Sequence, residues 1–435
     1  MKTSSFQIIL FAVFGVATLV GLFVFATYSS KGDGEDTVGT VVIWGTLPKA
    51  GMQSTLTAVA QVDTTLKNVS YVQKDAATLP SDLATAIATG IAPDLVLASQ
   101  EELHALAKFI TPISFSKLSA NTFTNTFVSG GGIFSEPTGV GYYGVPFLID
   151  PLALFSNRSM LSNSGIAKPP ATWEALTGLV PSIAVLTPSR QITRGLIALG
   201  TYTNVHNARG ILSALSLQQN IPLSSYSSGG SLVANLGVSA TSGIAPGPAV
   251  LNFYTQFADP SKVSYTWNAS LKDSQQTFLA GDLALYIGYV SEARYLKVAN
   301  PNLDFIVTPL PQPATARTKS TYGLIYAFLI PHGAKNAVGA YQAAALLTNS
   351  AAQTIAVAYT GLAPTVLTEL AKAPSDPVIA VAYAEALYSK GWLSPMPVDT
   401  DRIFSGMIND VISGRLELNT ALTNAESSLS ALLEK

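Results

Sequence analysis

The sequence predicts an α/β protein that is large enough for two domains. The chain has 435 residues, of which 48% are hydrophobic, so it can bury a large core. In its first quarter, short apolar runs alternate with helix-like segments. A stretch punctuated by glycine and proline then lies at residues 142–176. Alternation of continuous apolar strands with helices is typical of parallel sheets covered by helices.

The first quarter of the chain supplies three predicted strands separated by helices. Each strand is a short run rich in β-branched or other apolar residues. The predicted strands are 40–44, 68–73 and 93–98, and the predicted helices are 52–66, 79–89 and 101–109. Ligands of parallel sheets bind at the carboxyl ends of the strands. The candidate ligand-binding residues at this edge are Trp44, Gly45, Ser99 and Gln100.

The stretch 142–176 is the one around which the rest of the chain can be arranged. Glycine and proline bracket the apolar run 145–149, which predicts a strand that enters and leaves sharply, with Pro151 at its end. Thr172 is a predicted N-cap for the helix that begins at Trp173.

The remainder of the chain continues with mixed helices and strands. The segment 224–242 is rich in Ser, Gly and Ala and poorly periodic, which predicts an exposed loop. Apolar spacing of i, i+3 and i+4 predicts helical structure in the Ala-rich region 334–359. The other predicted helices are 193–199, 209–218 and 248–257, and a further strand is predicted at 322–330.

A set of residues spread along the chain carries a family resemblance. They are Ala92, Pro93 and Asp94; Tyr143, Gly144, Val145 and Pro146; Asp150, Leu154, Phe155, Asn157 and Gly165; Pro169, Pro170, Thr172, Trp173 and Glu174; and Phe278, Gly281 and Ala284. Their order resembles the extracellular solute-binding proteins of ABC importers, the family that includes maltose-binding protein. The resemblance spans roughly residues 40–435. Ser156 and Ser159 depart from the family pattern, and Leu285 replaces its usual Met.

The resemblance implies a two-lobed periplasmic-binding-protein-like fold of type II, with the ligand in the cleft between the lobes. The stretch near Asp150 would be the first crossing between lobes, and therefore both hinge and cleft floor. The implied first lobe is 39–148 plus 319–367, and the implied second lobe is 149–318 plus 368–435. Hinge closure would capture the solute, and the loaded form would dock on an ABC permease that this chain does not contain.

The N-terminus carries a candidate membrane anchor. Residues 6–28 have no charged side chain and are long enough to span a bilayer at about 1.5 Å per helical residue. The charges that flank this segment place the body outside the cytoplasm. The alternative is a cleavable signal peptide, with a cut after Ser29 or Ser30, but its apolar region would be unusually long. We predict an uncleaved transmembrane anchor at 1–28 and a tether at 29–38.

Composition narrows the function classes. Charged residues make up 11% of the chain, against about 25% in ordinary globular proteins, and the net charge is −2. No basic block is present, which argues against a nucleic-acid partner. The chain has no cysteine, and its three histidines are far apart in sequence, so we predict no metal and no cofactor. No nucleophile elbow or phosphate-binding loop occurs, and we predict a binding protein rather than an enzyme.

Aromatic residues at predicted strand ends and loops are the main ligand-binding candidates, because sugar rings stack on them. Core packing is the commoner role of any one such residue. Asp150 could accept hydrogen bonds from ligand hydroxyls or simply fix the hinge, and the sequence leaves both open. The candidates in addition to those at the first sheet edge are Tyr143, Asp150, Trp267, Tyr289, Tyr322 and Trp392.

These observations predict an extracytoplasmic, membrane-anchored solute-binding protein for a small neutral solute, with carbohydrate as the ligand class. One alternative is a sensor or adhesion module that reuses the same fold, since fold does not determine function. The other is a surface glycosidase, which would need two carboxylates converging in the cleft.

Overall fold

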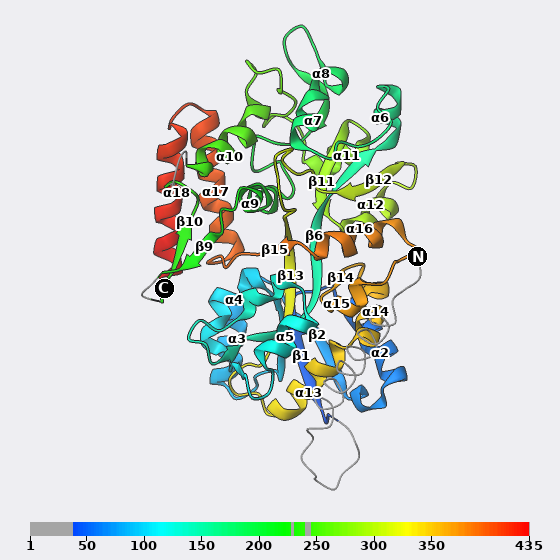
Figure 1. Cartoon of the computed structure of the whole chain (residues 1–435), viewed down its shortest axis with the longest axis vertical. Helices are drawn as coiled ribbons and strands as arrows, with labels where there is room; N and C mark the ends of the chain where they lie inside the picture. Colours follow the sequence, from blue (N-terminus) through cyan, green and yellow to red (C-terminus); the bar gives the residue numbers. More distant parts are fainter. Residues whose placement is uncertain (1–37, 228–229, 240–244, 435) are drawn as a thin grey trace, which may run out of the picture.

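The computed structural model describes residues 38–227, 230–239 and 245–434. It has two α/β lobes, one above the other in Figure 1, joined by long strands that run between them. The predicted two-lobed α/β architecture is therefore confirmed. We call the part built on the first three strands lobe 1, and the part reached through the crossing strands lobe 2.

Lobe 1 is built on a sheet in the order β2-β1-β3-β13-β6. The three strands that come first in the chain pair in parallel, with β1 in the middle, and β13 is antiparallel to both of its neighbours. Strand β13, where the chain returns to lobe 1, thus lies between two strands that come much earlier in the sequence. The strands are β1 (Val41–Gly45), β2 (Val69–Gln73), β3 (Leu95–Ser99), β6 (Gly144–Asn157) and β13 (Thr321–Leu329).

The strand β6 passes from lobe 1 into lobe 2, and all of its 14 residues are buried. Its first half pairs with β13, and its second half pairs with β11 and β12. The predicted end of this strand at Pro151 is wrong, because the strand continues to Asn157. Pro151 is tolerated because it stands where β6 changes from one set of partners to the other. Pro146 likewise lies beside a bulge in β6, where the pairing with β13 skips Phe147 between Leu148 and Pro146.

Lobe 2 extends the same sheet through β11, β8 and β7, with β12 also paired to β6. The predicted helix at 193–199 is wrong, because residues 192–197 form β8, which pairs in parallel with β11. The strands are β7 (Val185–Leu186), β8 (Ile192–Ile197), β11 (Leu283–Tyr289) and β12 (Phe305–Pro309).

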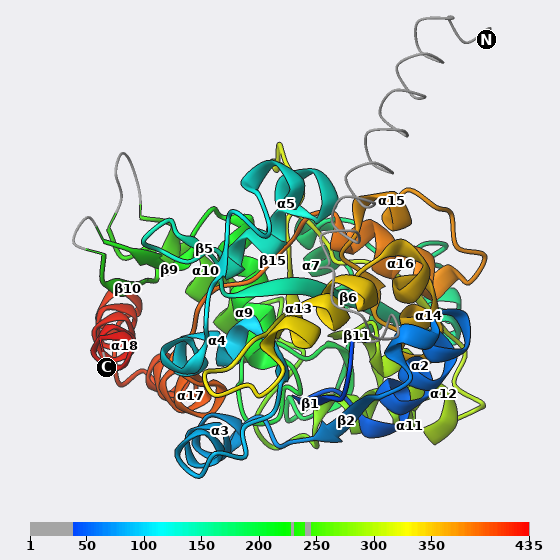
Figure 2. The ribbon, with the colours of Figure 1, turned by 90° about the horizontal axis from the view of Figure 1, so that it is seen from below.

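Helices cover both lobes. In lobe 1, α14 packs along α2, as Figures 1 and 2 show. Around lobe 1 lie α2 (Lys49–Val62), α3 (Leu79–Ala88), α4 (Gln100–Leu106), α5 (Ala120–Thr126), α13 (Ala337–Leu347), α14 (Ser350–Thr360) and α15 (Leu367–Leu370). Around lobe 2 lie α6 (Arg158–Asn163), α7 (Trp173–Gly178), α8 (Val180–Ile183), α9 (Ala208–Gln218), α10 (Pro246–Thr255), α11 (Ser274–Ala280) and α12 (Glu292–Ala299).

The C-terminal helices pack mainly on the second lobe. Helix α16 (Pro377–Ala386) contacts β6 and β12, whereas α17 (Pro397–Ile412) and α18 (Leu418–Leu433) pack on each other and on α10. Short strands complete the described structure: β4 (Ile113–Ser114), β5 (Gly141–Tyr142), β9 (Leu223–Tyr226), β10 (Leu232–Asn235), β14 (Ala363–Pro364) and β15 (Ser389–Lys390).

The predicted loop at 224–242 contains a hairpin instead, formed by β9 and β10. Helix α18 supplies the contacts that order it, because Ser430 Oγ accepts from the Ala234 amide at 3.1 Å and Glu426 accepts from the Leu236 amide at 2.6 Å. The segment lacks a periodic apolar pattern of its own, so a tertiary partner decides its structure.

The predicted helix N-cap at Thr172 is confirmed. The Thr172 hydroxyl accepts a hydrogen bond from the Ala175 amide at 3.2 Å and caps α7. Gly281 ends α11 with a φ of 83°, a left-handed conformation that glycine adopts without a Cβ penalty. The predicted membrane-spanning segment at 6–28 lies outside the described residues. Among residues 38–434, with the gaps given above, no helix is long and apolar enough to cross a membrane.

Candidate functional site between the lobes

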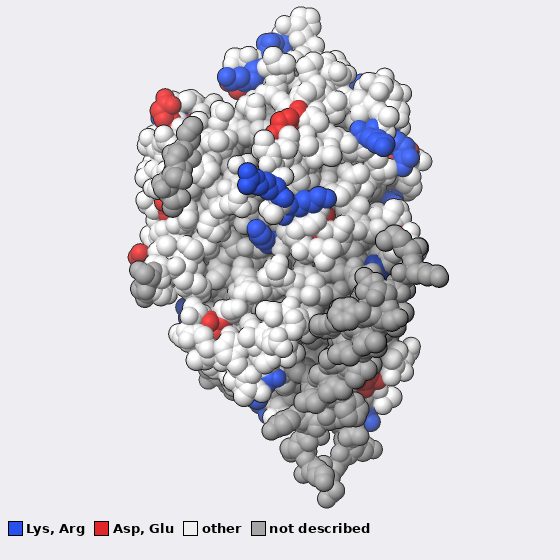
Figure 3. Space-filling model, viewed as in Figure 1, with Lys and Arg blue, Asp and Glu red and all other residues white. Residues whose placement is uncertain are grey.

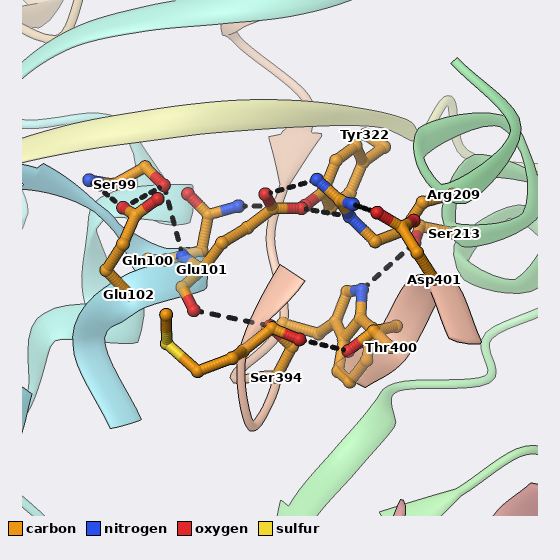
Figure 4. A network of polar contacts seen from close by, with 12 residues as sticks. Ser99, Gln100, Glu101, Glu102, Arg209, Ser213, Tyr322, Ser394, Thr400 and Asp401 are labelled. Carbon is orange, nitrogen blue, oxygen red and sulfur yellow. Dashed lines mark hydrogen bonds and ion pairs between the residues drawn. The ribbon is translucent and has the colours of Figure 1, made fainter. Parts of the chain in front are cut away.

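The two lobes meet beside the crossing strands, where α4 of lobe 1 faces α9 of lobe 2. The start of α4 lies directly after β3, so it is placed at the carboxyl end of a parallel strand, as predicted for a ligand site. The segment that follows β15 lies between the two helices, because Ser394 Oγ donates to the Glu101 carbonyl at 3.3 Å and Trp392 reaches Ser213 of α9. Figure 4 shows this arrangement from close by.

A partly buried ion-pair cluster occupies the meeting point. Arg209 at the start of α9 donates to Glu101 through Nε at 3.0 Å and through Nη2 at 2.8 Å, a two-point contact across the lobes. Its Nη1 donates to Asp401 of α17 at 2.6 Å. Tyr322 also donates to Glu101, and Tyr202 donates to Asp401 at 2.6 Å. We call these five residues the inter-lobe network.

Burial and ion pairing together determine the charge state of Arg209 in the network. The side chains of Arg209 and Glu101 are 20% and 5% exposed, and a two-point guanidinium–carboxylate contact is among the stronger charge-assisted hydrogen bonds. Burial alone would lower the pKa of Arg209, but the two carboxylates outweigh it and raise that pKa above its ordinary value. Arg209 is therefore a permanent cation here.

Gln100, a predicted site residue, is fully buried and joins α4 to β13. Its Nε2 donates to the Tyr322 hydroxyl at 3.2 Å and to the Gly323 carbonyl at 3.1 Å. Its Oε1 accepts from the Ile325 amide at 2.7 Å. With all these bonds made inside the chain, Gln100 positions Tyr322 within the network.

Ser99, the preceding predicted residue, caps α4 in a capping box with Glu102. The Glu102 carboxyl accepts from the Ser99 amide at 2.8 Å and from its hydroxyl at 2.7 Å. Burial, together with the charge of Glu101, raises the pKa of Glu102 to about 7. This pair serves the helix start, the structural role that acids in a first turn commonly have.

Two tyrosines border the network with open hydroxyl groups. Tyr289 and Tyr326 are partly exposed, and neither hydroxyl bonds another residue of the described part of the chain. Burial and the nearby charges, including that of Glu101 for both, raise the pKa of each phenol well above its ordinary value, so each stays protonated. Gly210 allows this arrangement, because a Cβ there would lie 2.8 Å from the Tyr289 hydroxyl oxygen.

Asp150 lies on β6 at the crossing and contacts lobe 2. Its carboxyl accepts from the Ser291 amide at 3.1 Å and from the Ser291 hydroxyl at 2.5 Å. Burial raises the pKa of Asp150 to about 7, with a further contribution from Glu292. Of the two roles that the sequence left open, these contacts favour the one in which Asp150 fixes the crossing.

The other predicted residues have contacts outside the network or at its edge. Trp392 is 2% exposed and donates from Nε1 to Ser213 Oγ at 2.9 Å. Trp267 is fully buried in the core of lobe 2, so the structure does not bring it to the lobe junction.

Trp44, Gly45 and Tyr143, three further predicted residues, also lie in lobe 1. The Trp44 ring is covered by Lys74, whose Nζ lies 3.9 Å from the ring centroid. Gly45 packs under the Tyr71 ring, which a Cβ would approach to 2.8 Å. The Tyr143 amide donates to the Phe134 carbonyl at 2.7 Å, and burial raises the pKa of its phenol to about 12.

A second inter-lobe contact lies on the other side of the crossing strands, between α12 and α14 (Figure 1). Arg294 of α12 donates to the Tyr359 carbonyl at 2.9 Å and to the Ala358 carbonyl at 2.5 Å. These carbonyls stand at the C-terminal end of α14, where a cation is favoured by the helix dipole. The lobes are thus bridged by arginine on both sides of β6.

The sequence alone does not indicate that Arg209 and Asp401 are site residues. They lie 108 and 300 positions from Glu101, and a single sequence has no signal that pairs them. The sparseness of charge is the one available clue, since each buried ion in such a chain needs a partner. On the face shown in Figure 3, small groups of acidic and basic side chains are separated by uncharged surface.

The described residues contain no group of three or more acidic or histidine side chains arranged to hold a metal ion. A pocket of about 340 Å³ lies in lobe 2, between β8 and the 267–282 segment, and no residue of the inter-lobe network lines it.

Two α/β lobes joined by crossing strands, with polar and aromatic groups where they meet, define a two-lobed binding protein. Residues 60–383 match the family model of bacterial extracellular solute-binding proteins, which is more than half of the 435-residue chain. The chain therefore belongs to this family, as the motifs predict. The family places the body of the protein outside the cytoplasm, and it is a family of binding proteins rather than enzymes. No curated protein matches the chain in sequence.

Solved structures share this fold. A cyclo/maltodextrin-binding protein complexed with maltotetraose aligns with 92% of this chain and 98% of its own, with a TM-score of 0.71 and 16% identity. A cyclic α-maltosyl-1,6-maltose binding protein from Arthrobacter globiformis aligns with 91% and 99%, with a TM-score of 0.71 and 14% identity. An ABC transporter solute-binding protein from Thermotoga lettingae, bound with α-D-tagatose, aligns with 91% and 99%, with a TM-score of 0.65 and 20% identity.

Proposed function

We propose that this protein captures a small neutral carbohydrate between its lobes by hinge closure and delivers it to the permease of an ABC importer. The observation that carries the proposal is the pair of open hydroxyls of Tyr289 and Tyr326 at the lobe junction. Each belongs to an aromatic ring that a sugar face can stack on, and each can donate to or accept from a sugar hydroxyl.

The charges at the junction support a neutral ligand. Glu101 and Asp401 are paired with Arg209, and Asp150 accepts two hydrogen bonds from Ser291. The open hydrogen-bonding capacity is therefore that of uncharged groups. The similar structures described with maltotetraose and with α-D-tagatose support carbohydrate as the class.

The moving units in this proposal are the lobes predicted from the motifs, 39–148 plus 319–367 and 149–318 plus 368–435. The segment 130–143 and the crossing near Asp150 would absorb the motion. A glycosidase is not favoured, because the carboxylates at the junction already have donors within the chain and the family is one of binding proteins.

The proposal includes an uncleaved N-terminal anchor at 1–28 with a tether at 29–38. The support is the uncharged length of the 6–28 segment. Mass determination of the mature protein, together with alkaline extraction of membranes, tests this. An intact N-terminus that resists extraction is expected, and a chain that begins near Ser30 and washes off would refute the anchor.

Thermal unfolding of the purified full-length chain, with and without ligand panels, tests the binding function. The panels are neutral oligosaccharides, amino acids, peptides and polyols. A ligand of the folded state adds about 2.7 kcal/mol of stability at a hundredfold excess over its dissociation constant. A shift with one sugar class, without turnover of that sugar, is expected. No shift with any sugar would refute carbohydrate capture.

Variants locate the site. Tyr289→Phe and Tyr326→Phe each remove one hydroxyl, and we expect the dissociation constant of the bound sugar to rise about three- to tenfold, the loss of one hydrogen bond. Tyr295→Phe is the matched control, because Tyr295 is 55% exposed on α12. Equal affinity in all three variants would place the ligand elsewhere.

A further inference from the structure

Arg209 is the residue of the inter-lobe network that contacts carboxylates of both lobes. It belongs to α9, which packs on α17, so its bond to Asp401 lies within lobe 2. Its two bonds to Glu101 cross to the start of α4 in lobe 1 (Figure 4). The guanidinium group therefore uses one nitrogen on its own lobe and two on the other.

When the lobes separate, the ions on each side of the contact between Arg209 and Glu101 keep a hydrogen-bonding partner in their own lobe. Glu101 retains the Tyr322 hydroxyl, which belongs to β13 and is held by Gln100. On the other side, Asp401 retains both Arg209 and the Tyr202 hydroxyl. Separation thus breaks only the bonds between Arg209 and Glu101, and it leaves no ion without a hydrogen-bonding partner.

Because the ions of each lobe keep hydrogen-bonding partners within that lobe, the contact between Arg209 and Glu101 is reversible. A buried ion that loses its only partner is strongly disfavoured, and a pair built that way would lock the lobes together. Here the separating ions keep partners and regain water, so the two states can lie close in free energy, as a binding cycle requires. The planar two-point geometry also forms at only one relative position of the lobes.

We propose that Arg209 is a reversible clasp that holds the lobes in their closed position, that Glu101 is its receptor, and that Asp401 is a positioning residue that keeps the guanidinium aimed across the junction. The proposal deepens the hinge-closure function and rests on it. Arg294 also bridges the lobes, on the other side of the crossing strands.

Distance measurements between spin labels on the two lobes test the clasp without any carbohydrate. The chain has no cysteine, so Thr85→Cys on α3 and Asn409→Cys on α17, both exposed, provide the only two labelling sites. The full-length chain is compared with the same chain carrying Arg209→Ala. We expect the ratio of closed to open molecules to fall about tenfold, which corresponds to about 1.4 kcal/mol.

Two further variants define the mechanism. Glu101→Gln keeps the shape of the side chain and removes its charge, so it is expected to open the lobes even if Arg209→Ala folds poorly. Asp401→Asn is expected to open them less, because Arg209 remains and is only less well aimed. Arg402→Ala is the matched control, since Arg402 is 68% exposed and pairs with Asp399 on its own helix.

Unchanged distances in both Arg209→Ala and Glu101→Gln would overturn the clasp, as would an equal change in Arg402→Ala. Because no sugar is used, these results do not depend on the ligand. If the clasp variants open the lobes but no sugar raises the melting temperature of any of these chains, the ligand class is wrong and the clasp stands.

Discussion

Replacing Asp150 by Asn is expected to stabilise the protein at neutral and alkaline pH. Asp150 is 5% exposed, and burial raises its pKa from 3.8 to about 7. An amide of the same shape accepts from the Ser291 amide through Oδ1 and donates to the Ser291 hydroxyl through Nδ2, so both contacts of the carboxyl are retained.

The sign and size of the effect follow from proton linkage. Between about pH 4 and pH 7 the native state holds the Asp150 proton and the unfolded chain does not, so the unfolding free energy falls as the pH rises. The destabilisation that comes from ionising Asp150 in the folded protein is absent below about pH 4 and fully present above about pH 7. A pKa difference of about three, at 1.36 kcal/mol for each, sets an upper bound of about 4 kcal/mol.

Urea unfolding of the full-length chain and of Asp150→Asn at pH 5, 7 and 8.5 measures this difference. The variant is expected to gain stability relative to the native chain as the pH rises, and the gain is expected to level off above pH 7. Glu102 and Glu385, whose pKa values burial also raises to about 7, leave a residual pH dependence in both chains. Asp282→Asn, at an exposed position, is the control.

A constant difference at all three pH values would refute this reasoning. So would a variant that is less stable at pH 8.5 than the native chain. Either result would mean that Asp150 is ionised throughout and that its charge supports the crossing.

Three further changes follow from the contacts of single residues. Gly210→Ala is expected to weaken sugar binding at least about tenfold in calorimetric titration, because the added Cβ would lie 2.8 Å from the Tyr289 hydroxyl oxygen and displace it. Unchanged affinity would remove Tyr289 from the site. Gln353 Oε1 accepts hydrogen bonds from the Thr365 and Val366 amides at 3.0 and 3.1 Å. Gln353→Leu is therefore expected to lower the unfolding free energy in urea by about 2–4 kcal/mol and to speed hydrogen exchange at these two amides. Unchanged exchange there would contradict this prediction. Trp392→Phe is expected to lower the unfolding free energy in urea by about 1–3 kcal/mol, because it leaves Ser213 Oγ without its donor, Trp392 Nε1, at 2.9 Å. Adding Ser213→Ala to this variant should restore part of the lost stability.

Much of the fold could be predicted because local chemistry and tertiary structure agree there. Strands β1 and β3 of lobe 1 are continuous apolar runs, and the helix ends at Thr172 and Gly281 carry residues suited to caps. The errors arise where tertiary contacts decide. β8 is a strand because β11 pairs with it, and the 223–235 hairpin forms because α18 covers it. Pro151 was expected to end a strand, but a change of pairing partner accommodates it.

The candidate site could be predicted only in part, for a physical reason. Strand ends locate a sheet edge, and this rule found Ser99 and Gln100 beside the network. Tyr289 and Tyr322 followed from their places at predicted strand ends, whereas Arg209 and Asp401 depend on which surfaces face each other once both lobes have folded. Residue type and a predicted loop position placed Trp267 among the candidates, and the structure places it in a core.

The position of β13 has a consequence for how the chain folds as it is made. β13 fills the place between β3 and β6, yet it begins 222 residues after β3 ends. Until residue 329 has been synthesised, the first sheet lacks the strand that lies between β3 and β6, and the facing edges of β3 and β6 remain unpaired. Non-local pairing of this kind slows folding and leaves strand edges open to wrong partners. The first lobe is therefore begun first and completed late, and any early pairing of β3 with β6 must be undone before β13 can enter.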